Sequence, residues 1–207
     1  CRMIIFNKAF EACPLIAILR GVRPEEVMDI GQVLVHTGFT IIEVPLNSPS
    51  PYQSIQLLQE RFGGKVLIGA GTVTSVEQVD EVKRHGGRLI VMPHADPAVI
   101  AAAKAHRLYC TPGVATPTEG FTALKAGADA LKMFPAEQLG IGALSAWKSI
   151  FPPEVRFIPV GGITPDNMPG YLKAGAAGFG LGSALYRAGK SPEDVALAAG
   201  RFIQALS

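Results

Sequence analysis

Lys132 is the residue whose surroundings in the sequence most strongly suggest chemistry. It ends the apolar run Ala128–Lys132 near the middle of the chain. Burial at the end of a strand disfavours the charged ammonium and lowers its pKa, and a neutral amine attacks carbonyl carbons to form a Schiff base. The alternative is a lysine on a loop just past the strand, with its amino group in water, because lysine is rarely fully buried.

Glu43 and Arg20 also belong to short apolar runs, Thr40–Pro45 and Leu15–Arg20. A carboxylate with a raised pKa can move protons, and a guanidinium group can hold an anionic part of a substrate. Each charge has an alternative role in an ion pair that orders the protein interior. Together with Lys132, these residues predict an enzyme that breaks or forms a carbon–carbon bond beside a carbonyl group.

Two glycine turns predict a phosphate site. Gly161-Gly162 and Gly182-Ser183 each follow an apolar run, and glycine lets the backbone approach an anion and point N–H groups at it. A short helix that starts near Ser183 would add its positive amino end. The alternative is that these are plain turn glycines, but the turns after the last two strands of a barrel are its usual phosphate site.

These residues are positioned by eight short β-type runs, each followed by a helical pattern. The runs recur about every 20 to 28 residues and are continuously apolar, as strands covered on both faces are. They are Leu15–Arg20, Thr40–Pro45, Val66–Ala70, Arg88–Met92, Leu108–Thr111, Ala128–Lys132, Arg156–Val160 and Ala177–Leu181.

Helical signals fill the segments between the runs. Helix starts are predicted at Thr74-Ser75 and within 164–167, where Pro165 would stand in a first helical turn. Two apolar helix faces and four helix-ending glycines complete the pattern: Val27, Ile30, Val33 and Leu34; Val76, Val79 and Val82; and Gly38, Gly86, Gly127 and Gly175.

Eight strand–helix units in 207 residues predict a (β/α)8 TIM barrel, a single domain spanning 1–207 with a short N-terminal helix. Catalytic groups of such barrels sit where strands end and loops begin, so Arg20, Glu43 and Lys132 would meet at one mouth. A doubly wound open sheet is the alternative. However, the first turn, Arg20–Pro24, lacks the glycine-rich fingerprint that this fold usually carries.

Composition excludes several other classes of protein. Hydrophobic residues make up 48% of the chain, and a net charge of +2 is too small to indicate binding to nucleic acid or a membrane surface. The sequence lacks the run of about 18 apolar residues that would predict a transmembrane helix, and no signal peptide is expected. Three widely spaced cysteines favour a reducing cytoplasm. Cys1-Arg2 precedes Met3, which could be the natural start.

The segments that carry these residues resemble the bacterial 2-keto-3-deoxy-6-phosphogluconate and -galactonate aldolases, a class I aldolase family. The resemblance covers nearly the whole chain, and its motifs keep their order and spacing. They are Pro14–Gly21, Ile42–Pro49, Ile68–Val73, Leu131–Ala136 and Gly180–Ser183.

The resemblance implies a role for each residue of the site. It also implies an enzyme without metal or cofactor that forms a homotrimer. Its substrate would be a phosphorylated keto-acid sugar, cleaved to pyruvate and glyceraldehyde 3-phosphate. The implied roles are the Schiff base for Lys132, proton transfer for Glu43, substrate contacts for Arg20 and Thr72, and phosphate binding for Gly161, Gly162, Gly182 and Ser183.

Two features resemble the galactonate branch of the family. One is Pro45–Pro49, because the gluconate branch usually has a Thr-Leu-Arg-Thr-like stretch there. The other is Val160, where the gluconate branch often has threonine, and an apolar side chain should alter discrimination at the C4 hydroxyl of the substrate. We expect cleavage of 2-dehydro-3-deoxy-6-phospho-D-galactonate in galactonate catabolism, with the gluconate epimer or both epimers as the alternative.

Three other functions stay open on the sequence alone. A metal-dependent pyruvate aldolase would need converging ligands, and among the histidines only His94 falls at the mouth, where we expect it on the rim rather than against substrate. A phosphosugar isomerase or epimerase would use acid and base groups without an imine. A phosphosugar sensor would explain the glycine turns but not a buried lysine beside a carboxylate.

Overall fold

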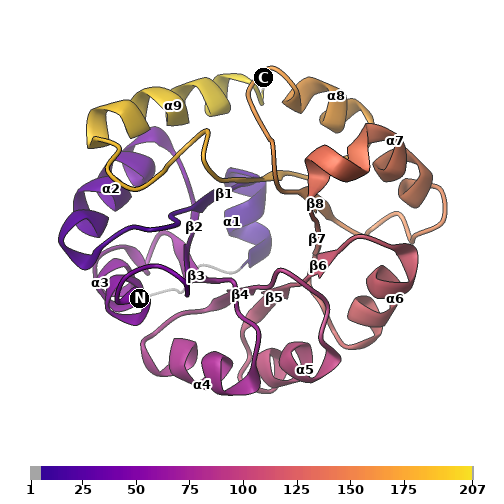
Figure 1. Cartoon of the computed structure of the whole chain (residues 1–207), viewed down its shortest axis with the longest axis horizontal. Helices are drawn as coiled ribbons and strands as arrows, with labels where there is room; N and C mark the ends of the chain where they lie inside the picture. The colour runs from indigo at the N-terminus through magenta and orange to yellow at the C-terminus, as the bar shows by residue number, and fades with distance from the viewer. Residues whose placement is uncertain (1–5, 207) are drawn as a thin grey trace.

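A computed structural model describes residues 6–206 and shows a ring of helices around a set of strands (Figure 1). Cys1-Arg2 and Met3 lie outside the described residues. The predicted N-terminal helix is α1 (Phe6–Ala12). The other helices are α2 (Pro24–Thr37), α3 (Pro51–Phe62), α4 (Val76–Arg84), α5 (Pro97–Ala105), α6 (Pro117–Lys125), α7 (Ala136–Lys148), α8 (Met168–Lys173) and α9 (Pro192–Gln204).

Each of the predicted β-type runs overlaps a strand, and all the strand pairings in residues 6–206 are parallel. The parallel α/β class is therefore confirmed. The strands are β1 (Leu15–Ile18), β2 (Ile41–Pro45), β3 (Leu67–Gly71), β4 (Leu89–Val91), β5 (Tyr109–Thr111), β6 (Gly113–Val114), β7 (Leu131–Met133), β8 (Phe157–Pro159) and β9 (Phe179–Leu181).

The strands form a six-stranded sheet in the order β5-β4-β3-β2-β1-β9 and a three-stranded sheet in the order β6-β7-β8. The short strand β6 was not predicted. Pro112 alone separates it from β5. At the other edge, a parallel bridge joins Val160, next to β8, to Gly180 of β9. The two sheets are thus linked at both edges.

Alternating side chains give each strand two buried faces. On β2, Ile42 and Val44 belong to a large cluster packed against the helices, whereas Ile41 belongs to a smaller cluster on the opposite face. That smaller cluster is the interior of the ring of strands, and Glu43 follows Ile41 at a spacing of two on the same face. The burial pattern explains why the strands read as continuously apolar rather than alternating.

Helix α1 closes one end of this interior. Phe6 and Phe10 pack in the inner cluster, and Thr40 Oγ1 donates a hydrogen bond of 2.6 Å to the carbonyl of Ala9. Figure 1 shows α1 in the middle of the ring, behind the strands. Burying each phenylalanine side chain contributes about 1.5–3 kcal/mol to stability. Because α1 closes one end of the interior, the opposite end, where the strands end, stays open to a substrate.

Two strand boundaries differ from the prediction and change how site residues are placed. β1 ends at Ile18, so Arg20 lies in the following turn and is exposed. β7 runs to Met133, which makes Lys132 the middle residue of the strand instead of its last. The ladder continues beyond it because Phe134 N–H donates to the carbonyl of Val114 at 3.2 Å.

Helix predictions were confirmed at some positions and wrong at others. Ser75 caps α4 by accepting a hydrogen bond from Gln78 N, as predicted. The helix start predicted within 164–167 comes slightly later, because residues 165–167 form a turn before α8 begins at Met168, and Asn167 Oδ1 accepts from Thr164 N at 3.0 Å. Val76 is 38% exposed and lies off the buried face of its helix. The predicted helix-ending glycines have left-handed φ, from 82° to 107°: Gly38, Gly86, Gly127 and Gly175.

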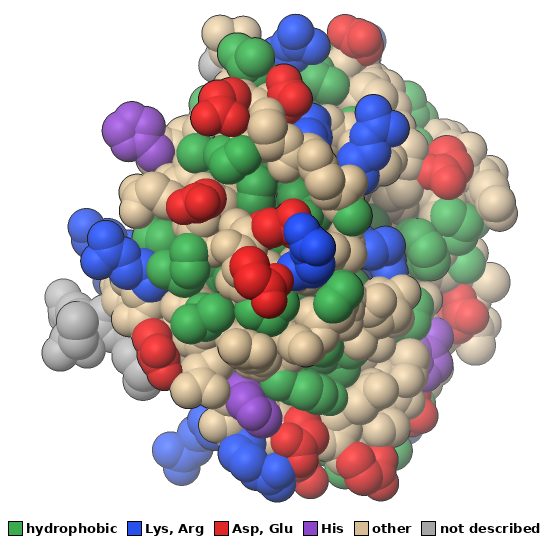
Figure 2. Space-filling model, turned by 60° about the vertical axis from the view of Figure 1, so that its left-hand side comes forward, with side chains coloured by type: hydrophobic (Ala, Val, Ile, Leu, Met, Phe, Trp, Pro, Cys, Tyr) green, Lys and Arg blue, Asp and Glu red, His purple; other side chains and the backbone are tan. Residues whose placement is uncertain are grey.

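The surface carries both signs of charge. Figure 2 shows acidic and basic side chains interspersed on one face of the molecule, in keeping with the net charge of +2. Within residues 6–206, every helix is too short or too polar to cross a membrane.

Candidate active site

Lys132 and Glu43 are both buried inside the ring of strands. Their exposed fractions are 6% and 2%. Leu131 and Met133, which flank Lys132, pack outward against the helices, so alternation turns Lys132 inward. Glu43 is turned inward in the same way on β2. The structure therefore brings together two residues that lie on different sheets and far apart in the sequence.

Burial perturbs both titrating groups. It raises the pKa of Glu43 to about 7, although the positive charges of Lys132 and Arg20 pull it back down. It lowers the pKa of Lys132, and Arg20 lowers it further while Glu43 opposes the shift. Each shift moves the group toward its neutral form at neutral pH, which suits an attacking amine and a proton carrier.

The Glu43 carboxylate lies directly against Gly71, the last residue of β3. A Cβ atom added at Gly71 would overlap all three carboxylate atoms. Glu43 Oε2 is buried and forms no hydrogen bond within residues 6–206. A buried polar atom without a partner is costly, and its free lone pairs leave it able to accept a proton from substrate.

Arg20 reaches the same site from the turn after β1. Its Nη1 donates to Asn47 Oδ1 at 2.8 Å, and the next residue, Gly21, donates its N–H to Ser48 Oγ at 2.9 Å. These two bonds join the turn after β1 to the Pro45–Pro49 loop after β2. Arg20 is exposed and its charge acts on both Glu43 and Lys132, so it lies near the buried pair and is available to an anionic group.

Thr72 and His94 occupy the rim of the mouth. Thr72 follows β3 with φ of 56°, a left-handed conformation that is unusual for a β-branched residue. Such strain is common at functional sites. The side chain of His94 is exposed, and its carbonyl accepts a hydrogen bond from Gly113 N at 3.2 Å.

The two predicted phosphate turns lie next to each other, because the Val160–Gly180 bridge joins the strands that precede them. Gly161 and Gly162 both have left-handed φ, 102° and 67°. A side chain at either glycine would collide with the carboxylate of Glu137 on α7.

The short helix expected near Ser183 is not formed. Residues 183–185 make a turn in which the N–H groups of Leu185 and Tyr186 donate to the carbonyl of Gly182, at 2.9 and 3.0 Å. A second turn follows, in which Lys190 N donates to the carbonyl of Arg187 at 3.0 Å, and the described residues between β9 and α9 form no helix. This turn can therefore offer individual N–H groups to an anion, but not the positive end of a helix.

Sequence reasoning assigned no role of their own to four residues that the fold brings to the site: Phe134, Asn47, Gly71 and Glu137. Only Phe134 carried a usable signal, since it stands two residues after Lys132 and therefore shares its face of the strand. Asn47, Gly71 and Glu137 become relevant through contacts between different strands and loops. Their spacing in the sequence could not indicate those contacts.

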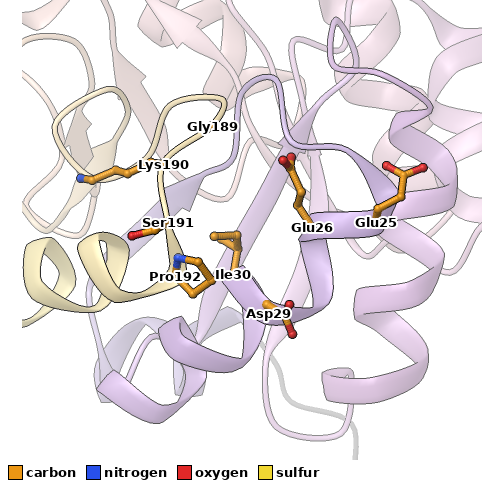
Figure 3. A pocket seen from close by; sticks show the side chains of 8 residues that line it. All are labelled: Glu25, Glu26, Asp29, Ile30, Gly189, Lys190, Ser191 and Pro192. Carbon is orange, nitrogen blue, oxygen red and sulfur yellow. The ribbon is translucent and has the colours of Figure 1, made fainter.

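A separate cavity of about 230 Å³ lies between α2 and the start of α9 (Figure 3). Glu25, Glu26 and Asp29 line it, and Glu26 is held by Arg23 at 2.7 Å. Lys190 turns its amino group to the carbonyl of Leu185 at 2.8 Å. An acidic wall of this kind does not suit an anionic substrate, and the cavity includes none of the predicted site residues.

The α/β fold and the pair of buried, oppositely shifted titrating groups are typical of an enzyme that works by proton transfer. The sequence model of the KDPG and KHG aldolase family matches residues 6–198. The 2-dehydro-3-deoxy-6-phosphogalactonate aldolase of Escherichia coli K12 is 47% identical over 192 residues, which are 93% of this chain and 94% of that protein.

Two solved structures extend the comparison. One described as native KDPGal has a TM-score of 0.92 and 47% identity, covering 93% of this chain and 94% of the other. The KDPG aldolase of Legionella pneumophila, with pyruvate captured as a covalent carbinolamine intermediate, has a TM-score of 0.84 and 28% identity, covering 95% and 96%. This chain belongs to the KDPG and KHG aldolase family. It is an aldolase, an enzyme of the lyase class.

Replacing Glu43 by Gln should remove a pH-dependent loss of stability. The folded chain holds the Glu43 proton up to about pH 7, whereas the ordinary pKa is 4.5. The favourable contribution present below pH 4.5 is therefore lost as the pH rises through 7. Relative to Glu43→Gln, the wild type should lose on the order of 3 kcal/mol of unfolding free energy across this range.

Urea unfolding of both proteins at a series of pH values measures this difference. Glu154 is an exposed carboxylate, and Glu154→Gln is the matched control that should run parallel to the wild type. A constant difference between the wild type and Glu43→Gln across the range would contradict the assigned burial.

Gly71→Ala should displace the Glu43 carboxylate while leaving the fold intact. The new methyl group would occupy the space of that carboxylate, and a shift of about 1 Å in a catalytic group costs roughly 100-fold in turnover. We expect kcat to fall by about that factor with little change in the unfolding temperature. Gly142→Ala, where a Cβ meets nothing within 4 Å, should behave as wild type. Normal turnover of Gly71→Ala would show that Gly71 does not fix the position of the Glu43 carboxylate.

Proposed function

We propose that this chain cleaves 2-dehydro-3-deoxy-6-phospho-D-galactonate to pyruvate and D-glyceraldehyde 3-phosphate, as a class I aldolase of galactonate catabolism. The observation that carries the proposal is the pairing of Lys132 and Glu43, with pKa values displaced toward neutrality. The 47% identity with the E. coli enzyme of that name supports the choice of substrate.

In the proposed mechanism the neutral amine of Lys132 attacks the C2 ketone of the substrate and forms an imine with loss of water. Glu43, through a water molecule, takes the proton of the C4 hydroxyl. The C3–C4 bond then breaks, and its electrons pass into the imine to give the enamine of pyruvate. Reprotonation of the enamine and hydrolysis release pyruvate. The scheme uses no metal and no cofactor. The covalent pyruvate adduct of the L. pneumophila relative supports it.

The remaining residues of the site would hold the substrate. Arg20 is oriented by Asn47 and would bind an anionic group through its planar guanidinium, with Thr72 as a further contact. We assign the phosphate to Gly161, Gly162, Gly182 and Ser183, because their neighbouring turns present backbone N–H groups at the ends of adjacent strands. Phosphate in this site would require the Glu137 carboxylate to turn away, since like charges repel.

We also propose an architecture for the chain. It is one domain with a closed (β/α)8 barrel, in which β5 and β6 act as one strand interrupted at Pro112. The Val160–Gly180 bridge supports closure at the other edge. We also propose a cytoplasmic homotrimer. Exposed apolar side chains such as Phe121 and Ile150, 46% and 54% exposed, are candidates for burial between subunits.

Borohydride trapping tests the proposed chemistry. With pyruvate and borohydride, the wild type should gain the mass of one reduced pyruvyl group, located on Lys132 by peptide mapping, and lose activity. Lys132→Met keeps the length of the side chain without the amine and should form no adduct. Lys125 is exposed on α6, and Lys125→Ala should be labelled as wild type. An adduct that persists in Lys132→Met, or active enzyme that forms none, would exclude the mechanism. Full activity after chelation would separate it from a metal-dependent aldolase.

The ratio of kcat/KM for the two C4-epimeric substrates tests the choice of substrate. We expect the galactonate epimer to be preferred. Val160→Thr keeps the shape of the side chain and adds a hydroxyl, so the ratio should move toward the gluconate epimer by roughly tenfold, the effect of about one hydrogen bond. Val76→Thr, at a position of α4 that is 38% exposed, is the control. An unchanged ratio in Val160→Thr would remove this residue from epimer selection.

A further inference from the structure

The aromatic ring of Phe134 faces the amine of Lys132. The distance from Lys132 Nζ to the ring centroid is 4.5 Å, with the nitrogen over the ring. Within residues 6–206, Nζ forms no hydrogen bond or salt bridge, so this ring is the one specific contact of the amine. The face of an aromatic ring is electron-rich and attracts a cation at this distance.

The fold fixes this contact from the backbone. Phe134 follows Lys132 at a spacing of two, and its N–H donates to Val114 O at 3.2 Å, which continues the strand ladder. Its half-buried side chain packs against the inner cluster that contains Ile158 and Val160. The ring is thus held in the interior of the barrel, beside the reacting nitrogen.

The charge on that nitrogen changes during the proposed reaction. The Nζ lone pair attacks C2 of the keto acid, and the electrons of the C=O double bond move to oxygen. The oxygen leaves as water with one proton from the amine and one from the Glu43 carboxyl group. The nitrogen keeps one hydrogen and one positive charge as an iminium ion. Desolvation keeps the resting amine toward its neutral form, whereas the iminium cannot lose its charge by deprotonation without becoming a poor electron sink.

We infer that Phe134 is a further catalytic residue, whose ring face stabilises the positive iminium formed on Lys132. This inference rests on the proposed function, since it assumes the Schiff base. Arg20 lies close enough to oppose a positive charge here and Glu43 close enough to favour it. The ring adds attraction without a negative charge of its own. It leaves the neutral amine free to attack, and stabilises it once it becomes cationic.

A series of fluorinated phenylalanines at position 134 tests this role. Fluorine withdraws electrons from the ring face with little change in size, so packing is conserved while cation binding weakens. We would measure the pyruvate concentration that gives half-maximal borohydride trapping near pH 7, where burial favours the neutral amine and Glu43 still carries part of its proton. That concentration should rise stepwise with mono-, tri- and pentafluorination, by roughly 3- to 30-fold in total. A flat series would overturn the inference.

Phe151 provides the matched control. It is 6% exposed and packs edge-on against Phe157 in the outer core, so the same fluorinated series there should leave trapping unchanged. An equal rise at Phe151 would show a general packing effect and would also overturn the inference. Failure of the proposed function looks different, because the unsubstituted enzyme would then form no adduct at any pyruvate concentration.

Discussion

Removing Lys132 and Glu43 from water is the constraint on which the rest of this structure depends. An isolated charge in a protein interior costs several kcal/mol, and both groups are nearly fully buried. Within residues 6–206, no tight ion pair cancels this cost. Each group is instead displaced toward its neutral form, and that displacement is the property that amine attack and proton transfer require.

The elements around Lys132 and Glu43 determine how much solvent reaches the two groups. One end of the interior is sealed by Phe6 and Phe10 of α1, so water and substrate have access only from the ends of the strands. Gly71 leaves space for the Glu43 carboxylate, and the ring of Phe134 lies against the Lys132 amine. These are apolar or missing side chains, and they keep the interior poorly solvated without adding charge.

Substrate recognition is assigned to loops, where the backbone is less regular. Arg20 is oriented by a hydrogen bond that it donates to Asn47 in the following loop, and Thr72, Gly161 and Gly162 all have left-handed φ. Rigid strands thus carry the buried lysine and carboxylate, while the turns after them carry the groups that we propose for contact with the outer parts of the substrate.

Much of the fold and the reacting pair followed from the sequence, because local rules determine them. Each continuous apolar run in the sequence corresponds to a strand in the structure, and helix-ending glycines such as Gly38 were correctly placed. A costly lysine inside the run Ala128–Lys132 was enough to suggest an amine nucleophile. Strand ends were less predictable, because the ladder extends or stops according to a partner strand, as Phe134 and Val114 illustrate.

Tertiary structure decided everything that depends on contacts between segments remote in sequence. It turned Arg20 out of its strand, replaced the expected helix near Ser183 with a turn, and placed Glu137 against the phosphate turn. It also set the pKa of Glu43, since burial and nearby charges exist only in the folded chain. The sequence determined which chemical groups are present and on which face of a strand they lie. Only packing of the whole chain decided how far each group is removed from water and what lies beside it.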